Sequence, residues 1–131
     1  MKKILLFVYL VSLLSSCSLT SENYKKREIY IEYIDIFKTS FPHFCYFYLE
    51  NCSSCALLEN KIIDYAESHS DFYIVIPTNK FNYGYDRDAN IGIKNYEEII
   101  ITGFPSMFYI ENQEIKNLYV GIKEITNKLH F

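Results

Sequence analysis

The 131-residue sequence predicts one α/β domain with a mixed central sheet of about four strands flanked by helices. Two observations carry this prediction. Apolar, aromatic runs at 44–49 and 72–76 are typical of buried strands, and the helical pattern between them makes the strands parallel neighbours. Strand patterns at 106–111 and 114–120 flank Asn112-Gln113, which indicates a hairpin.

The remaining elements follow in chain order. Apolar and acidic residues of 27–38 fall on different faces at helical spacing, so this segment is predicted to be a helix. Pro42 precedes the first strand, where a proline avoids a ladder hydrogen bond. The segment 77–90 is predicted to be a loop, and a short helical or irregular piece follows near 95–100. After Gly121, apolar residues at helical spacing predict a final amphipathic helix.

The beginning of the chain has the pattern of an export signal. Two lysines precede an apolar run that is shorter than the roughly 20 residues of a membrane-spanning helix. The Leu-Ser-Ser-Cys that ends at Cys17 resembles the lipobox of bacterial lipoproteins. The resemblance implies cleavage before Cys17 and a lipid anchor on the extracytoplasmic face of a bacterial membrane. We therefore expect a lipoprotein-type signal peptide at 1–16, a lipidated tether at 17–26 and the globular domain at 27–131. The alternative is an ordinary signal peptide with an incidental cysteine.

Composition and charge exclude one class of partner. The formal net charge is −3 at pH 7, and the chain has no basic run with interleaved aromatic residues. Nucleic acid is therefore not an expected partner. Export would place the cysteines in an oxidising compartment, where thiol–disulfide chemistry is permitted.

The candidate redox site is Cys52-Ser53-Ser54-Cys55, between the first strand and its helix. Asn51 is the expected N-cap. Because a helix N-terminus favours an anion, it favours the thiolate of Cys52, which is the candidate nucleophile. One turn further on, Cys55 can attack a mixed disulfide and is the candidate resolving thiol. Half of a zinc site is the alternative, but zinc needs four ligands and the three histidines are scattered singly. No metal and no cofactor is expected.

A second motif extends the comparison to a family. Together with Gly-Phe-Pro-Ser at 103–106, which opens the penultimate strand, the cysteine motif resembles the thioredoxin-like family over 27–131. The resemblance implies a cis peptide bond before Pro105, which would face the cysteines. It also implies that Phe104 offers backbone groups to an extended substrate segment while Cys52 attacks the substrate disulfide. Small exported thioredoxin-like lipoproteins and bacteriocin-transport accessory proteins are similar in layout.

Two departures from the family pattern leave the direction of electron flow open. Reducing thioredoxins carry a buried acid at the position of Tyr46 and a tryptophan beside the cysteine motif, and this chain has neither. Its Ser53-Ser54 dipeptide matches neither the Gly-Pro of reductants nor the Pro-His or Gly-His of strong oxidants. These two residues strongly influence the reduction potential.

The sequence thus predicts a membrane-anchored thiol–disulfide oxidoreductase. Its partners would be the thiols or disulfides of exported proteins and a membrane or extracytoplasmic redox protein that recycles it. The alternative is a non-catalytic accessory or binding lipoprotein in which the Cys52–Cys55 bond is structural. A surface antigen or adhesin is a third class, in which exposed aromatic residues at 81–85 would bind a ligand.

Two further features have a simple structural interpretation. Cys45 lies in the first apolar strand and is expected to be buried in the core. Asp86, Asp88, Asn90 and Glu97 match positions of a calcium-binding loop, but isoleucine stands where the turn requires glycine. An Asx-rich loop is the expectation, and calcium is the open alternative.

Overall fold

The computed structural model describes residues 27–78 and 80–131. The predicted signal peptide, the tether and Cys17 lie outside the described residues and stay predictions. Within the described part of the chain, no helix is long and apolar enough to cross a membrane.

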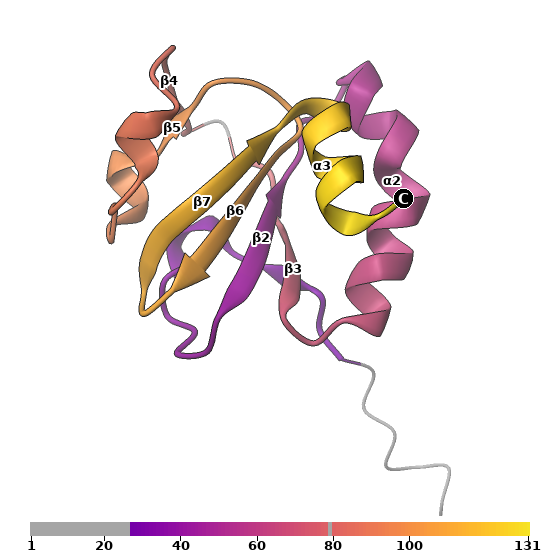
Figure 1. Ribbon diagram of the computed structural model, residues 1–131, viewed down its shortest axis with the longest axis horizontal. Coiled ribbons are helices and arrows are strands. Elements are labelled where there is room, and N and C mark those ends of the chain that lie inside the picture. The colour runs from indigo at the N-terminus through magenta and orange to yellow at the C-terminus, as the bar shows by residue number, and fades with distance from the viewer. Residues whose placement is uncertain (1–26, 79) are drawn as a thin grey trace, which may run out of the picture.

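A five-stranded sheet forms the centre of the domain (Figure 1). In sheet order, its strands are β1 (Tyr30–Ile31), β3 (Phe72–Val75), β2 (His43–Phe47), β6 (Ser106–Glu111) and β7 (Glu114–Val120). The first three strands run parallel, whereas β6 is antiparallel to both β2 and β7. The predicted α/β class and mixed sheet are confirmed, with one strand more than expected at the edge.

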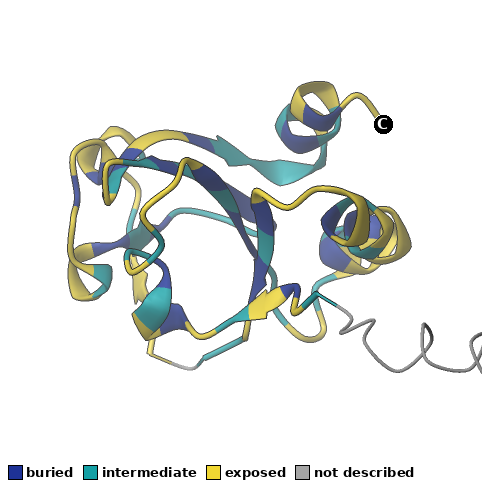
Figure 2. Ribbon diagram, turned by 90° about the horizontal axis from the view of Figure 1, so that it is seen from below, coloured by how far each residue is buried: buried dark blue, intermediate teal, exposed yellow. Residues whose placement is uncertain are grey.

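Different elements cover the two faces of the sheet (Figures 1 and 2). The helices α2 (Ser53–Ser68) and α3 (Gly121–Leu129) pack on one face, over a core that includes Tyr46, Ile62 and Met107. Segments after β1 and β3 cover the opposite face, where Cys45 and Phe108 are buried. Successive residues of β2 therefore point into different cores, as strand geometry requires. The predicted βαβ unit, hairpin and final helix are confirmed.

The segment between β3 and β6 is more structured than the predicted loop. It contains a small parallel sheet of β4 (Asn82–Tyr83) and β5 (Ile100–Ile101). Two 3₁₀ helices lie between these strands, η2 (Asp88–Asn90) and η3 (Tyr96–Glu98). The irregular piece predicted near 95–100 corresponds to η3 and the start of β5.

The predicted helix at 27–38 is wrong. The segment forms β1 and the 3₁₀ helix η1 (Tyr33–Asp35). The carbonyl of Ile29 accepts a hydrogen bond from the Ile74 N–H over 2.8 Å, and the carbonyl of Ile31 accepts one from Ile76 over 2.9 Å. The edge of β3 thus forms hydrogen bonds with backbone carbonyls that would accept hydrogen bonds within the segment if it were a helix. This strand pairing outweighs the helical spacing of the apolar residues.

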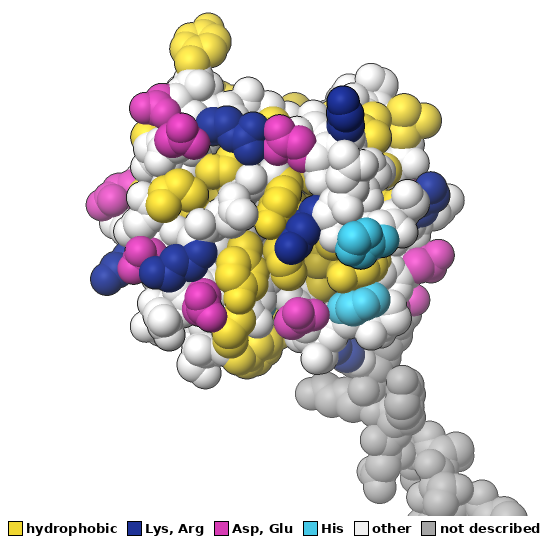
Figure 3. Space-filling model, in the orientation of Figure 1, with side chains coloured by type: hydrophobic (Ala, Val, Ile, Leu, Met, Phe, Trp, Pro, Cys, Tyr) yellow, Lys and Arg dark blue, Asp and Glu magenta, His cyan; other side chains and the backbone are white. Residues whose placement is uncertain are grey.

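Charged side chains of both signs are interspersed on the face that carries β7 and α3 (Figure 3). One pair anchors α3: the Glu124 carboxylate accepts hydrogen bonds from Arg87 over 2.9 Å and from the Val120 backbone N–H over 2.9 Å. Because Val120 is the N-cap of α3, Glu124 satisfies a donor at the helix start. Arg87 is the N-cap of η2, so this ion pair connects the start of η2 to α3.

Candidate active site

A tight turn between β2 and α2 places Cys52 at the start of the helix. Asn51 has a φ of 61°, a left-handed conformation that asparagine adopts more readily than most residues. Because this turn ends at Asn51, the N-cap is Cys52, with extended φ and ψ of −91° and 112°, and not the predicted Asn51. The predicted position of Cys52 at the helix N-terminus is confirmed.

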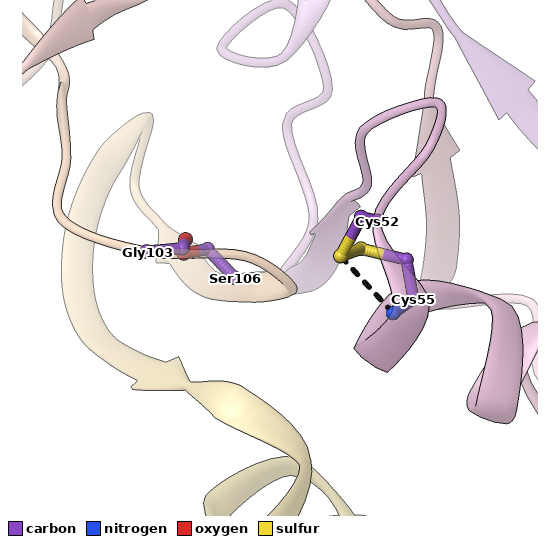
Figure 4. The surroundings of a disulfide bond; sticks show 4 residues. All are labelled: Cys52, Cys55, Gly103 and Ser106. Atoms are coloured by element: carbon purple, nitrogen blue, oxygen red, sulfur yellow. Dashed lines mark hydrogen bonds between the residues drawn. A yellow bond between two sulfur atoms is a disulfide. The ribbon is translucent and has the colours of Figure 1, made fainter.

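Cys52 and Cys55 form a disulfide, with their Cα atoms 5.2 Å apart (Figure 4). The backbone N–H of Cys55 donates a hydrogen bond to Cys52 Sγ over 3.1 Å. Cys52 is half-buried, whereas Cys55 is only 6% exposed. An incoming thiolate therefore has access to Cys52 Sγ in preference to Cys55 Sγ. In the reduced protein, the same N–H group and the helix N-terminus would stabilise a thiolate on Cys52.

The segment that begins β6 lies beside the disulfide (Figure 4). The Phe104–Pro105 peptide bond is cis, as the family resemblance implied. The Ser106 hydroxyl donates to the carbonyl of Gly103, and the Pro105 carbonyl accepts from the Gly121 N–H over 2.8 Å. Among the described residues, the backbone N–H and C=O of Phe104 have no hydrogen-bond partner. They are available to pair with an extended segment, and the substrate-binding role of Phe104 and Pro105 stays a prediction.

Aromatic side chains flank Phe104 on the side of β4. The ring centroid of Phe104 lies 5.9 Å from that of Phe81 and 6.3 Å from that of Tyr83. Phe81 is buried, so it belongs to the core and not to an exposed ligand-binding surface, whereas Tyr83 is 63% exposed. Phe104 and Tyr83 also line a shallow hollow of about 250 Å³.

A larger cavity of about 600 Å³ is lined by Cys52 and Cys55, but by no residue of 103–106. Three tyrosines line it, Tyr30 from β1, Tyr46 from β2 and Tyr48 just after β2. The carboxylate residues Glu50 and Glu59 are exposed and stand at its rim. The cavity therefore combines aromatic walls, acidic groups and the disulfide.

Tyr46 contributes an unpaired polar group to this cavity. Its side chain is 2% exposed, and its hydroxyl has no hydrogen-bond partner among the described residues. Burial raises the pKa of the phenol, so the hydroxyl stays protonated. Nearby, the pKa of Tyr48 is raised by burial and then by the charges of Tyr30, Glu50 and Glu59. These four groups are thus close enough to interact electrostatically.

Sequence reasoning identified Tyr46 only as a departure from a family pattern and did not predict the cavity. The lining residues come from β1, β2, α2 and β3, which are far apart in the sequence. The one available signal was the concentration of tyrosines just before the cysteine motif.

Cys45 is the second kind of thiol in the domain. It is fully buried and unpaired, which confirms the expected core position. Burial raises the pKa of its thiol, so Cys45 remains protonated and unreactive while the fold is intact. It lies on the face of β2 opposite Tyr46 and takes no part in the cavity.

The calcium-like segment is an Asx-rich loop. The Asn90 side chain is buried, donates to the Ile100 carbonyl over 2.9 Å and accepts from the Ile100 N–H over 2.8 Å. Asp86 Oδ1 accepts the backbone N–H of Asp88 over 3.1 Å. These oxygens are therefore engaged with backbone groups. Within 27–78 and 80–131, no group of three or more His, Cys, Asp or Glu side chains could hold a metal ion.

Comparison with known proteins identifies the fold. Thioredoxin f2 from Chlamydomonas reinhardtii has a similar crystal structure, with a TM-score of 0.51 and 14% sequence identity. The match covers 79% of this chain and 91% of the thioredoxin. No protein-family model and no curated protein sequence matches the chain. The chain has a thioredoxin-like fold, as the sequence predicted, and carries a CxxC pair at the start of its first long helix.

Proposed function

We propose that this chain is a thiol–disulfide oxidoreductase, anchored to a bacterial membrane through lipid on Cys17, that exchanges disulfides with exported proteins. The observation that carries the proposal is the Cys52–Cys55 disulfide at the N-terminus of α2, with one accessible residue and one buried residue. The lipid anchor and the exported substrates rest on the N-terminal sequence alone.

The exchange follows from the positions of the two sulfurs. In the reducing direction, the Cys52 thiolate attacks one sulfur of a substrate disulfide and releases the other as a thiolate. The Cys55 thiolate then attacks Cys52 Sγ, which forms the intramolecular disulfide and releases the second substrate thiolate. The reverse sequence converts a substrate dithiol to a disulfide. An external redox partner, an exported or membrane thiol–disulfide protein, returns the pair to its starting state.

The 103–106 segment supports the choice of a polypeptide as substrate. It lies beside the disulfide, and the backbone of Phe104 is without a hydrogen-bond partner in the described part of the chain. We propose that an extended substrate segment pairs with Phe104 and packs against Pro105 while its disulfide meets Cys52. Affinity would then come mainly from main-chain hydrogen bonds and little from particular side chains.

A trapping experiment tests the catalytic proposal. We expect Cys55→Ser to accumulate a mixed disulfide between Cys52 and substrate proteins, because the resolving thiol is absent. We expect Cys52→Ser to form no such adduct and to lose exchange. Non-reducing gels and mass spectrometry of the full-length variants measure both outcomes. An exchange rate that is the same in Cys52→Ser and the parent protein would contradict the proposal.

The alternative is an accessory lipoprotein whose disulfide is only structural, and the replacement of a buried acid by Tyr46 favours it. The equilibrium reduction potential of the Cys52–Cys55 pair separates the two functions. A potential of about −270 mV indicates a reductant and one of about −120 mV an oxidant, whereas a pair that stays oxidised below about −300 mV is structural.

The anchor has its own test. We expect the parent chain to incorporate radiolabelled fatty acid in bacteria and to fractionate with membranes. A Cys17→Ser variant is expected to lose the label. Labelling that persists in this variant would exclude Cys17 as the attachment site, without affecting the redox proposal.

A further inference from the structure

We propose that the cavity beside the disulfide is a subsite for a basic side chain, arginine or lysine, that neighbours the reacting cysteine of the substrate polypeptide. The inference rests on the proposed function and narrows its substrates to disulfides with a basic residue nearby. The cavity itself is defined by the three tyrosines Tyr30, Tyr46 and Tyr48 and the rim carboxylates Glu50 and Glu59.

The position of the cavity determines which part of a substrate reaches it. Cys52 and Cys55 form part of its wall, so a substrate cysteine that is bonded to Cys52 would lie next to the cavity. Residues of an extended chain are about 3.3 Å apart, which places the next one or two side chains within reach of the cavity. Its volume of about 600 Å³ exceeds what a single arginine side chain requires.

The charges of the cavity favour a cation. Glu50 and Glu59 are exposed at the rim, and among the described residues no lysine, arginine or histidine lines the cavity. Both carboxylates are close to Tyr48, because their charges add to the effect of burial in raising the pKa of this tyrosine. A guanidinium or ammonium group at the rim would therefore meet two negative charges and the faces of aromatic rings.

The unpaired hydroxyl of Tyr46 is the independent observation. This side chain is 2% exposed, lines the cavity, and has no hydrogen-bond partner among the described residues. A buried polar atom without a partner is unfavourable, and this hydroxyl is enclosed by protein atoms, so a substrate donor reaches it after a local movement of the cavity wall. Arginine has five N–H donors and lysine three, which a phenol oxygen can accept. The aliphatic stem of either residue would pack against Leu49 and Ile63 of the same wall.

The test compares peptide disulfides that differ in one charge. Reduced full-length protein reacts with peptides that carry arginine, citrulline or glutamate next to the cysteine, and the second-order rate constant of exchange is measured for each. Citrulline has nearly the shape of arginine without its charge. We expect the arginine peptide to react about fivefold faster than the citrulline peptide, the effect of two partly exposed charge pairs. The glutamate peptide is expected to be slowest, and the differences should shrink as salt is added.

Variants locate the source of the preference. A Glu50→Gln, Glu59→Gln double variant is expected to bring the arginine-to-citrulline ratio close to one. Tyr46→Phe is expected to lower the rates with the arginine and citrulline peptides about equally, by about twofold, and to keep their ratio, because both side chains have N–H donors for the hydroxyl. Asp64→Asn is the control. Asp64 lies in α2, as Glu59 does, but it does not line the cavity, so the variant should keep the ratio of the parent protein. Because the ratio compares two peptides on one variant, a change in the reactivity of Cys52 cancels.

The outcomes separate this inference from the proposed function. Equal rates for arginine and citrulline, with exchange intact, would overturn the subsite and leave the oxidoreductase. A parent ratio that survives in the double variant would also overturn it. A protein that exchanges with none of the peptides would contradict the proposed function and, with it, the subsite.

Discussion

Replacing Tyr46 by phenylalanine removes one oxygen atom from the core, and we expect this change to stabilise the fold. The hydroxyl is buried without a hydrogen-bond partner in the described part of the chain. The ring is held by the surrounding core, and its centroid lies 6.3 Å from that of Phe72 in a stacked arrangement that phenylalanine retains. The substitution therefore removes an unfavourable group and keeps the packing.

The size of the effect follows from the burial. A buried hydroxyl without a partner costs about 1–3 kcal/mol, and loss of the oxygen's packing contacts offsets part of the gain. We expect the free energy of unfolding to rise by about 1 kcal/mol. Such a gain at a site that lines the cavity is typical of a residue retained for function at the expense of stability.

Tyr33→Phe is the matched control, because the same atom is removed from a hydroxyl that has a partner. Tyr33 is also buried, and its hydroxyl donates a hydrogen bond to the Tyr96 carbonyl over 2.6 Å. Its removal leaves that carbonyl with only the more distant Ile99 N–H, at 3.3 Å, so the free energy of unfolding should fall by about 1 kcal/mol. The two substitutions are therefore expected to have opposite signs.

Urea unfolding of the oxidised proteins, followed by far-UV circular dichroism, measures both changes. The chain has no tryptophan whose fluorescence could report unfolding. Equal slopes with urea concentration for the parent and both variants are required for the comparison. If Tyr46→Phe destabilises the protein as much as Tyr33→Phe, the Tyr46 hydroxyl is already satisfied in the free protein. The unpaired-hydroxyl argument for the basic subsite would then fail.

Three further predictions concern the rest of the domain. The hydrogen bond from Arg87 lowers the pKa of Glu124, so its stabilisation is present above the unfolded pKa and is lost as pH falls through the lower folded value. Glu124→Gln should therefore cost at most about 1 kcal/mol at neutral pH and reduce the loss of stability below about pH 5, measured by urea unfolding across pH. Iodoacetamide should modify Cys45 only after unfolding, because the thiol is buried and its pKa is raised. The measurement is mass spectrometry of the reduced protein, and labelling of Cys45 in the folded state would refute the prediction. The ring nitrogens of His43 lie 2.8 and 2.9 Å from the backbone carbonyls of Phe41 and Ile36. An imidazole with one N–H donates to one of these carbonyls, so His43→Leu should lower the free energy of unfolding by about 1 kcal/mol; a neutral effect would contradict the assigned bond.

The elements that the sequence predicted correctly have signals contained within a short stretch. Both strands of the hairpin match the predicted bounds, because Asn112 and Gln113 take positive φ values of 53° and 58° in a two-residue turn. The position of Cys52 at the helix start was predictable for the same reason. The N-cap was misplaced by one residue because the left-handed turn at Asn51 leaves no trace in the periodicity.

The strands β4 and β5 could not be predicted in this way. Each contains two residues, so neither shows an alternation of apolar and polar side chains. They exist because the chain returns after η3 and pairs Asn82 with Ile100 in parallel. The close approach depends on Gly84, where a Cβ would lie 2.7 Å from Ile100 Cγ2. A contact between residues this far apart is a property of the folded chain and not of its local sequence.

The error at 27–38 also explains why the cavity was missed. As a helix, this segment would have left one edge of β3 unpaired, because β2 pairs with the other edge. As β1, it pairs Tyr30 with Ile74 and places both residues in the wall of the cavity beside the disulfide. The cysteine motif, the cis proline and the fold could be predicted from local motifs, whereas the groups proposed to select a substrate depend on long-range pairing. If the basic subsite is correct, the groups that select the substrate are brought together by the pairing of β1 with β3, which local sequence patterns did not predict.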